Sequence, residues 1–223
     1  MEDIKKLVLQ NNDSFEIYYN ELIEYNKKIN LTAITEKEDV FIKHFYDSCL
    51  SQNYIPNNAS VVDIGTGAGF PGLPLKIIRP DIELHLVDSL NKRIVFLDSL
   101  KEKLNLNYFT THARAEDFCV NYRESFDVCV SRAVAKLNTL AEYCLPLVKL
   151  GGVFIAYKGS NIEQEVEESK KAINLLGGQI EEIRNIILPD NKGERNLIII
   201  KKKEKTSLKY PRNKNLPKIK PIV

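Results

Sequence analysis

The stretch of sequence that decides the fold is Val61–Gly72, which reads VVDIGTGAGFPG. Its first four residues are a short, largely apolar run, which is typical of a strand buried in a parallel sheet. The glycines that follow let the backbone turn sharply and approach a ligand closely. A helix that begins near Pro71 would direct its free amides at the same ligand. The stretch therefore predicts a strand, a ligand-binding turn and a helix.

Strands and helices alternate along most of the remaining chain. The further strand-like runs are Leu84–Val87, Tyr108–Thr111, Phe126–Val130 and Val153–Ala156, and the helical patterns are Leu73–Arg79, Lys92–Leu104, Leu137–Val148 and Ile162–Leu176. This alternation indicates βαβ units and a parallel sheet. Two last strand-like runs, Ile180–Leu188 and Asn196–Lys202, are joined by a short loop and predict a hairpin at an antiparallel edge. The expected fold class is therefore α/β, with a Rossmann-like, mostly parallel sheet.

We expect three segments. Residues 1–58 predict a helical cap, because apolar residues recur at helical spacing from Phe15 to Ile29. Thr35 and Glu38 fit a capping box at the start of a second helix, which runs to about Gln52. Residues 59–203 predict the ligand-binding domain, and residues 204–223 a basic, extended tail rich in Pro and Lys. A hydrophobic content of 43% excludes wholesale disorder.

The net charge of +2 conceals an uneven distribution. Residues 201–223 hold nine Lys or Arg and one acid, which leaves 23 basic and 29 acidic residues in positions 1–200. This asymmetry suggests a polyanionic partner for the basic end. The four cysteines and three histidines show no metal-site spacing, and no signal peptide or membrane-spanning run is apparent. We therefore expect a reduced, cytoplasmic protein without a metal.

The glycine-rich turn fits two ligands. Gly67, Gly69 and Gly72 match the GxGxxG pattern of dinucleotide-binding proteins, whereas Asp63, Gly65, Gly67 and Gly69 match the DxGxGxG loop of S-adenosylmethionine (SAM) methyltransferases. Asp88 ends the next strand about 20 residues later, where an acid accepts hydrogen bonds from ribose hydroxyls. Both ligands contain a ribose, so Asp88 indicates a nucleoside without choosing between them. A purely structural turn is the third and least favoured interpretation.

Two further motifs follow the third and fourth strands. Ala115 and Glu116 lie beyond the third strand, where they could line a slot for adenine. Ser131-Arg132-Ala133-Val134-Ala135 follows the fourth strand, where methyltransferases of this class face the methyl acceptor. Neither the Asp/Asn-Pro-Pro-aromatic string of amine methylation nor a Pro-Cys pair is present. These absences argue against methylation of an exocyclic amine and against a cysteine adduct.

At this point the sequence resembles the bacterial 16S rRNA guanine-N7 methyltransferases, the RsmG or glucose-inhibited division protein B family. The resemblance spans most of the chain. The strings that carry it are Asn30-Leu31-Thr32, His44-Phe45-Tyr46-Asp47-Ser48, Asp63–Pro74, Val87–Arg93, Phe96-Leu97, Ser131-Arg132-Ala133, Lys158-Gly159 and Gly193-Glu194-Arg195. The tail is similar to a basic extension seen in some members.

The resemblance implies a SAM-dependent fold with seven strands, the last antiparallel, and an N-terminal helical cap. It also implies SAM as the cofactor and one guanine of 16S rRNA as the substrate, presented by the small ribosomal subunit or an assembly intermediate. Together with the loop positions Asp63, Gly67 and Gly69, the expected SAM contacts are Gly65, Phe70, Asp88, Ser89, Leu90, Ala115, Glu116 and Arg132.

The chemistry of guanine N7 explains why the sequence shows no acid–base pair. This nitrogen carries a lone pair and no proton, so attack on the SAM methyl needs alignment and exclusion of water rather than a general base. The residues that we expect to face RNA are Arg132, Lys158, Arg195, His44 and Asn30. Each also has a simpler interpretation: His44 as a packed imidazole, Asn30 as a helix cap, and Arg195 as a surface side chain of the hairpin. The tail lysines would contact phosphates or merely solubilise the chain.

Two alternatives remain open at this point. An NAD-dependent oxidoreductase fits the glycine pattern, but the chain lacks a second substrate domain, and Asp63 favours SAM. A non-catalytic RNA-binding assembly factor fits the basic tail, but the complete glycine loop and Asp88 argue against it. In either case we expect a monomer.

Overall fold

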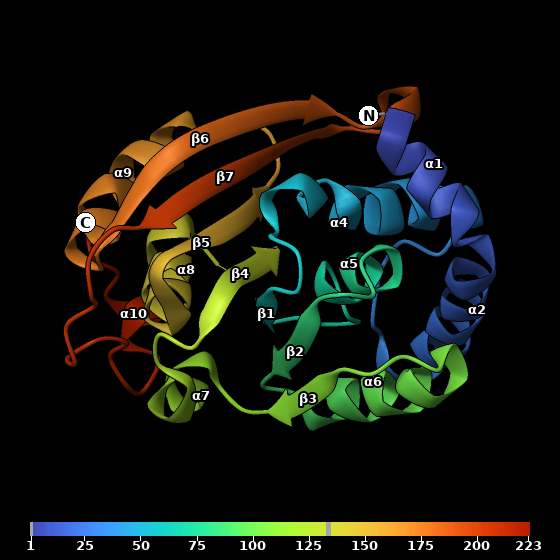
Figure 1. Ribbon diagram of the computed structural model, residues 1–223, viewed down its shortest axis with the longest axis horizontal. Coiled ribbons are helices and arrows are strands. Elements are labelled where there is room, and N and C mark those ends of the chain that lie inside the picture. Colours follow the sequence, from blue (N-terminus) through green and yellow to red (C-terminus); the bar gives the residue numbers. More distant parts are fainter. Residues whose placement is uncertain (1, 133–134) are drawn as a thin grey trace.

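The computed structural model describes residues 2–132 and 135–223, and it contains one seven-stranded sheet (Figure 1). The strands are β1 (Ser60–Ile64), β2 (Glu83–Asp88), β3 (Phe109–His112), β4 (Phe126–Arg132), β5 (Val148–Lys158), β6 (Gly178–Ile187) and β7 (Glu194–Lys202). Their order is β3-β2-β1-β4-β5-β7-β6, and β7 runs antiparallel to both of its neighbours. The expected α/β fold with an antiparallel last strand is confirmed. However, β7 is not an edge strand, because it inserts between β5 and β6.

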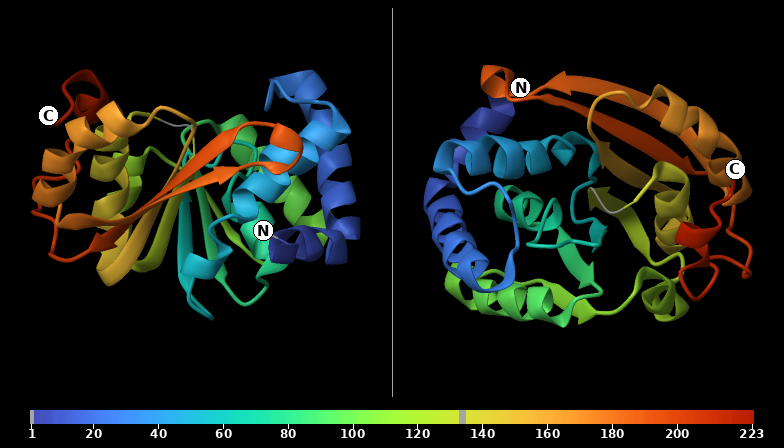
Figure 2. Two further views of the ribbon diagram at one scale, coloured as in Figure 1. Left: turned by 90° about the horizontal axis from the view of Figure 1, so that it is seen from above. Right: turned by 180° about the vertical axis from the view of Figure 1, so that it is seen from behind.

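Helices cover both faces of the sheet (Figure 2). One face carries α1 (Glu2–Gln10), α2 (Asn12–Ile29), α3 (Lys37–Val40), the π-helical turn η1 (Phe41–Tyr46), α4 (Asp47–Cys49), η2 (Gln52–Tyr54), α5 (Gly72–Ile78) and α6 (Asn91–Leu104). The other carries α7 (Ala115–Tyr122), α8 (Leu137–Cys144), η3 (Leu145–Leu147) and α9 (Glu163–Leu175). The short η4 (Pro189–Asn191) lies in the β6–β7 hairpin, and α10 (Leu216–Ile219) lies near the end of the chain.

The alternation of side chains along each strand divides the core into two clusters. In β1, Val61 belongs to the cluster beneath α5 and α6, whereas Val62 belongs to the cluster beneath α8. In β5, Ile155 and Ala156 divide in the same way. Because successive strand residues point to opposite faces, a strand that is apolar throughout is buried on both sides. This explains why the strands read as apolar runs.

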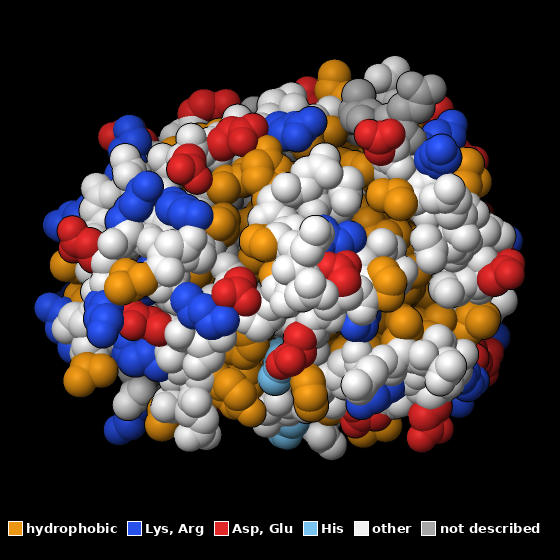
Figure 3. Space-filling model, viewed as in Figure 1, with side chains coloured by type: hydrophobic (Ala, Val, Ile, Leu, Met, Phe, Trp, Pro, Cys, Tyr) orange, Lys and Arg blue, Asp and Glu red, His pale blue; other side chains and the backbone are white. Residues whose placement is uncertain are grey.

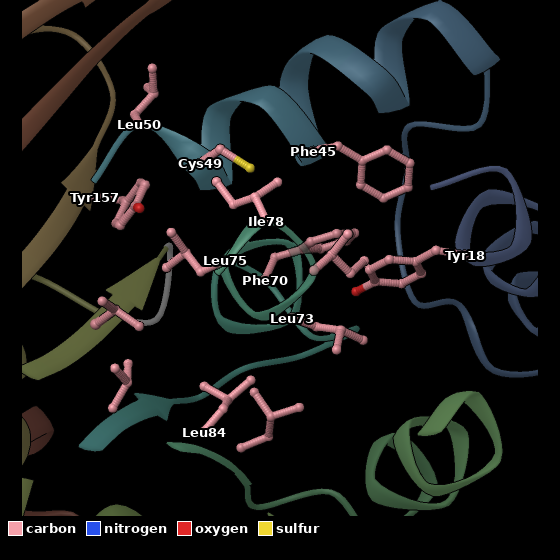
Figure 4. Close-up of a cluster of buried hydrophobic side chains, with 14 of the residues drawn as sticks. Tyr18, Phe45, Cys49, Leu50, Phe70, Leu73, Leu75, Ile78, Leu84 and Tyr157 are labelled. Atoms are coloured by element: carbon pink, nitrogen blue, oxygen red, sulfur yellow. The ribbon is translucent and has the colours of Figure 1, made fainter. Parts of the chain in front are cut away.

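The N-terminal helices pack directly on the glycine loop (Figure 4). The ring of Tyr18 stacks on Phe70 at 5.4 Å and lies 5.0 Å from Phe45, and its hydroxyl donates to the carbonyl of Ala68 at 2.5 Å. Burial raises the pKa of Tyr18, which therefore stays a protonated donor. The helical cap and the loop thus share one part of the core.

Two local expectations for the cap are wrong. The capping box does not form, because α3 begins after Glu36 and that end has no side-chain cap bond, while the Thr35 carbonyl accepts from Tyr19 at 3.2 Å instead. The second helix is also not a regular α-helix, since its centre, Phe41–Tyr46, is a π-helical turn. Turns of this kind occur preferentially at functional sites, and this one carries His44.

The basic C-terminal segment is not simply extended. It contains α10 and packs on α8, where both carboxylate oxygens of buried Glu142 accept hydrogen bonds from Arg212, at 2.8 and 2.6 Å. Tyr210 and Pro217 are buried as well. Lys202 is equally inaccessible, and burial lowers its pKa to about 8. The expectation of an extended tail failed because a buried carboxylate and apolar side chains hold this segment to the domain.

No helix among the described residues is long and apolar enough to cross a bilayer. Within the same ranges, no three His, Cys, Asp or Glu side chains gather as they would around a metal ion. The four cysteines are buried and carry free thiols.

Candidate functional site

A cavity of about 630 Å³ opens where β1, β2, β4 and β5 reach their carboxyl ends. Ligands of open α/β sheets bind at this edge. A second cavity of about 340 Å³ adjoins it, and both are lined by Gly65, Asp88 and Ser89. We call the smaller space the nucleoside half, because Ala115 and Glu116 line it, and the larger space the acceptor half, because Arg132 and His44 line it.

The glycines of the loop have different tasks. Gly67 has φ +63°, and a Cβ added there would meet nothing within 4 Å, so this glycine faces open space. Gly69 has φ +103°, but its Cβ would lie 2.5 Å from the Tyr18 hydroxyl and 3.0 Å from Leu97. A Cβ on Gly72 would lie 2.7 Å from Leu86. Gly67 is therefore the ligand-facing glycine, whereas Gly69 and Gly72 permit close packing.

Asp63 organises the loop from beneath. Its Oδ2 accepts from the Thr66 hydroxyl at 2.7 Å and from the Gly72 amide at 2.8 Å, while Oδ1 is buried without a partner. Burial raises the pKa of Asp63 to about 7, against the lowering effect of these bonds. Neither Asp63 nor Gly69 lines the cavity. The structure places both beneath the residues that line the cavity, and the expected contacts of Asp63 and Gly69 with the cofactor stay a prediction.

Asp88 joins the two halves of the site. It is only 2% exposed, and its oxygens accept from the amides of Gly67 and Leu90, each at 2.9 Å. The Arg93 guanidinium lies 3.0 Å from Oδ2 and also lines the cavity. A carboxylate has about four acceptor positions, so ribose hydroxyls must share Asp88 with these donors or displace Arg93. Sequence reasoning did not single out Arg93.

The nucleoside half is lined by four more of the expected cofactor residues, which are Ser89, Leu90, Ala115 and Glu116. Glu116 is buried, and its Oε1 has no hydrogen-bond partner, although the Arg114 guanidinium lies 4.0 Å away. A buried carboxylate oxygen without a partner is costly. Tyr143 of α8 forms part of the same wall.

The acceptor half is built on one buried aspartate, Asp47. Its Oδ2 accepts from Nη1 of Arg132 at 2.9 Å and from Nε of Arg195 at 3.0 Å. Its Oδ1 is buried without a partner. These three side chains come from α4, β4 and β7, which are distant in sequence. One carboxylate thus fixes two guanidinium groups and leaves a net positive charge at the cavity wall.

An imidazole and a phenyl ring complete this wall. His44 stacks on Phe70 with 4.6 Å between ring centres, and the Arg132 guanidinium lies 4.9 Å from the centre of the Phe70 ring. Nε2 of His44 lies 2.7 Å from the Thr32 hydroxyl, and Nδ1 lies 3.2 Å from the Lys43 carbonyl. Burial, assisted by the charge of Arg132, lowers the pKa of His44 from 6.5 to about 3. The imidazole is therefore neutral near pH 7.

Two expected RNA-facing residues occupy less prominent positions. Lys158 lines the cavity, but its Nζ donates to Glu165 and to the Ala135 carbonyl, each at 2.7 Å. Asn30 is the exposed C-cap of α2 with φ 49°, and it does not line the cavity, although Leu31 and Thr32 do. The simpler interpretation of Asn30 as a helix cap agrees with this placement.

The structure thus brings together most of the expected site residues and adds several that were not assigned. The additions are Asp47, Thr32, Arg93, Tyr157 and Tyr143. Asp47 meets Arg132 and Arg195 only through tertiary contacts, which no local sequence pattern signals. Ala133 and Val134 of the fourth motif lie outside the described residues.

Comparison with known proteins identifies the family. The family model described as "GidB: rRNA small subunit methyltransferase G" matches residues 11–198. The chain is 51% identical over 215 residues to Ribosomal RNA small subunit methyltransferase G of Oceanobacillus iheyensis, a match that covers 94% of this chain and 90% of that protein. It is 48% identical over 215 residues to the protein of the same name from Bacillus subtilis, a match that covers 94% of this chain and 90% of that protein.

Solved structures agree on the fold. TYW2 of M. jannaschii, solved in complex with AdoMet, superposes with a TM-score of 0.54 at 17% identity, over 67% of this chain and 70% of that one. The ribosomal protein L11 methylase of Lactobacillus delbrueckii gives a TM-score of 0.56 at 14% identity, over 73% and 80%. At these identities the likeness shows the fold alone. The family match and the identity near one half over almost the whole chain place this protein in the rRNA small subunit methyltransferase G family.

Proposed function

We propose that this chain transfers the methyl group of SAM to N7 of one guanine in 16S rRNA, in line and without a general base. The observation that carries the proposal is the acceptor half, where Asp47 fixes two guanidinium groups beside an imidazole that is held neutral. This wall offers hydrogen-bond donors and stacking surfaces to a base. A pKa of about 3 makes His44 too weak a base to deprotonate an amine.

The residues of the nucleoside half fit SAM. The unpartnered Oε1 of Glu116 suits the exocyclic amine of adenine, Asp88 suits the ribose hydroxyls, and the open space at Gly67 admits the chain that leads to sulfur. When bound, SAM supplies a methyl group already activated on a positively charged sulfur. The residues of this protein therefore need only to bind, orient and exclude water.

The acceptor half supports recognition of guanine. An arginine pairs well with guanine O6 or with phosphate, and unstacked RNA bases stack on aromatic side chains. Arg132, fixed on Asp47 and lying over Phe70, suits O6 better than N7, which must stay open to the methyl group. Methylation at N7 makes the base cationic, and Asp47 offsets one of the two guanidinium charges at this wall.

The SAM and RNA contacts expected from the sequence are part of this proposal. Gly65, Phe70, Ser89, Leu90 and Ala115 contact SAM, and Arg195 and Lys158 approach the RNA. Asn30 acts indirectly, by ending α2 where Leu31 and Thr32 join the cavity. The division into residues 1–58, 59–203 and 204–223 also stands as a proposal. We further propose a cytoplasmic monomer that acts on the small ribosomal subunit or an intermediate of its assembly.

The test is methyl transfer by the purified protein. Small subunits and naked 16S rRNA from cells that lack the gene are incubated with methyl-labelled SAM, and the RNA is digested to nucleosides. We expect label in 7-methylguanosine alone. Label in any other nucleoside contradicts the proposed acceptor atom. Binding to small subunits without transfer of label supports a non-catalytic assembly factor instead. The family match already decides against the NAD-dependent oxidoreductase.

A further inference from the structure

Two residues of the C-terminal segment line the nucleoside half of the cavity. Asn215 and Lys218 share this lining with Ser89 and Leu90, which follow β2, and with Glu116 of α7. They lie more than 120 residues from Asp88 in sequence, and Lys218 belongs to α10. The sequence had suggested for this segment only a role as a basic arm. A role as a basic arm does not explain why this segment lies at the cavity.

The segment is fixed at this place by bonds to α8. The Arg212 amide and guanidinium donate to fully buried Glu142, and the neighbouring residue, Tyr143, lines the cavity. The Thr139 hydroxyl donates to the Pro217 carbonyl at 3.0 Å. Buried charge pairs of this kind hold their geometry closely when both carboxylate oxygens are satisfied. The α8 helix thus carries both the inner wall of the cavity and the anchor of the outer wall.

The shape of a lysine side chain also suits this position. The buried carboxylates of the wall, Asp88 and Glu116, already lie 3.0 and 4.0 Å from the guanidinium groups of Arg93 and Arg114. Lys218 brings a positive charge to the same wall, and its residue is exposed to solvent. The methylene stem of a lysine covers apolar surface while its ammonium group stays in water. A side chain of this kind suits the outer face of a flat, apolar base.

We propose that the docked C-terminal segment is the outer wall of the nucleoside pocket, and that Lys218 and Asn215 close over the adenosine moiety of the cofactor. This inference rests on the proposed function, since it takes the ligand to be SAM. It assigns a cofactor-positioning role to a segment whose charge alone had suggested RNA. The segment therefore affects the lifetime of bound cofactor, independently of any contact with rRNA.

The chain offers a closely matched pair of variants. Lys218→Ala removes a side chain that lines the cavity, whereas Lys220→Ala removes the same charge from the exposed end of the same helix, outside the cavity lining. Both are made in the full-length protein, and their thermal unfolding is compared with that of the wild type. Calorimetry then measures the Kd of S-adenosylhomocysteine and of 5′-methylthioadenosine, which lacks the amino-acid portion.

For Lys218→Ala we expect both Kd values to rise by about three- to tenfold, with unfolding unchanged, because a side chain over the base is lost. Lys220→Ala should bind both ligands like the wild type. Equal Kd values for the two variants, or a loss for S-adenosylhomocysteine only, would overturn the inference. If no variant and not even the wild type bound S-adenosylhomocysteine, the proposed function itself would fail. If all three proteins bound both ligands normally, the proposed outer wall would be refuted and the proposed function would stand.

Discussion

The two halves of the cavity meet at Asp88 but are built in opposite ways. The nucleoside half holds the carboxylates of Asp88 and Glu116 beside Arg114 and Lys218, and one oxygen of Glu116 accepts no hydrogen bond. The acceptor half holds Arg132 and Arg195, both already paired with Asp47. Under the proposed function, the first half holds the cofactor and the second offers fixed donors to the RNA. The variants described below disturb the two halves one at a time.

The largest effect should follow loss of the carboxylate that organises the acceptor half. Asp47→Ala leaves two guanidinium groups without their buried partner, which typically costs about 3–5 kcal/mol of stability. Urea unfolding measures the change. Asp39→Ala is the matched control. Asp39 also pairs with two cationic side chains, Lys43 and Lys192, but it lies at the surface. A loss for Asp47→Ala as small as that for Asp39→Ala would contradict the account.

The next effect belongs to the nucleoside half. Asp88→Ala should weaken binding of S-adenosylhomocysteine by about 1–3 kcal/mol, because charge-assisted hydrogen bonds to ribose are left unmade. Part of the loss would come from the loop, since Asp88 also accepts from the Gly67 amide. Calorimetry provides the measurement, and Asp98→Ala, an exposed change on α6, is the control. An unaltered affinity in Asp88→Ala would show that Asp88 does not bind the ribose.

A third prediction concerns the pH dependence of the acceptor half. The pKa of His44 is about 3 in the folded chain and about 6.5 when unfolded, so the unfolded chain binds more protons between these values. The stability that depends on His44 is therefore lost as the pH falls through this window. Between pH 7 and pH 5, the wild type should lose about 2 kcal/mol more than His44→Gln. Parallel losses in urea unfolding at the two pH values would show that His44 is not held neutral.

The smallest effect should come from the exposed lysines of the C-terminal segment. Figure 3 shows Lys and Arg side chains gathered on the side of the molecule where α9 and α10 lie. Replacing Lys205, Lys209 and Lys214 with Ala should make the salt dependence of RNA binding shallower by up to about 2 in the log–log slope. Truncation is a poorer test, because Thr206 and Tyr210 are buried. An unchanged slope would show that these lysines do not contact RNA phosphates.

Sequence patterns predicted the sheet and most of the nucleoside half, for a physical reason. Asp88 ends β2 and Glu116 lies in the first turn of the helix after β3, and parallel strands bring their carboxyl ends to one edge. The acceptor half depends on tertiary contacts among α4, β4 and β7, which no local pattern encodes. Asp47 was accordingly missed, and the docking of Arg212 on Glu142 was hidden within a segment that looked merely basic. For Asp63 the structure adds hydrogen bonds from Thr66 and Gly72 that no sequence pattern indicated.

The most direct test of the proposed function is chemical mapping of N7-methylguanine in 16S rRNA from cells with and without the gene. Borohydride reduction and aniline cleavage break the chain at this modified base. We expect one cleavage site that is absent without the gene, returns fully with the wild-type protein, and returns only in part with Asp88→Ala. An identical cleavage pattern with and without the gene would contradict the claim that this protein methylates guanine N7.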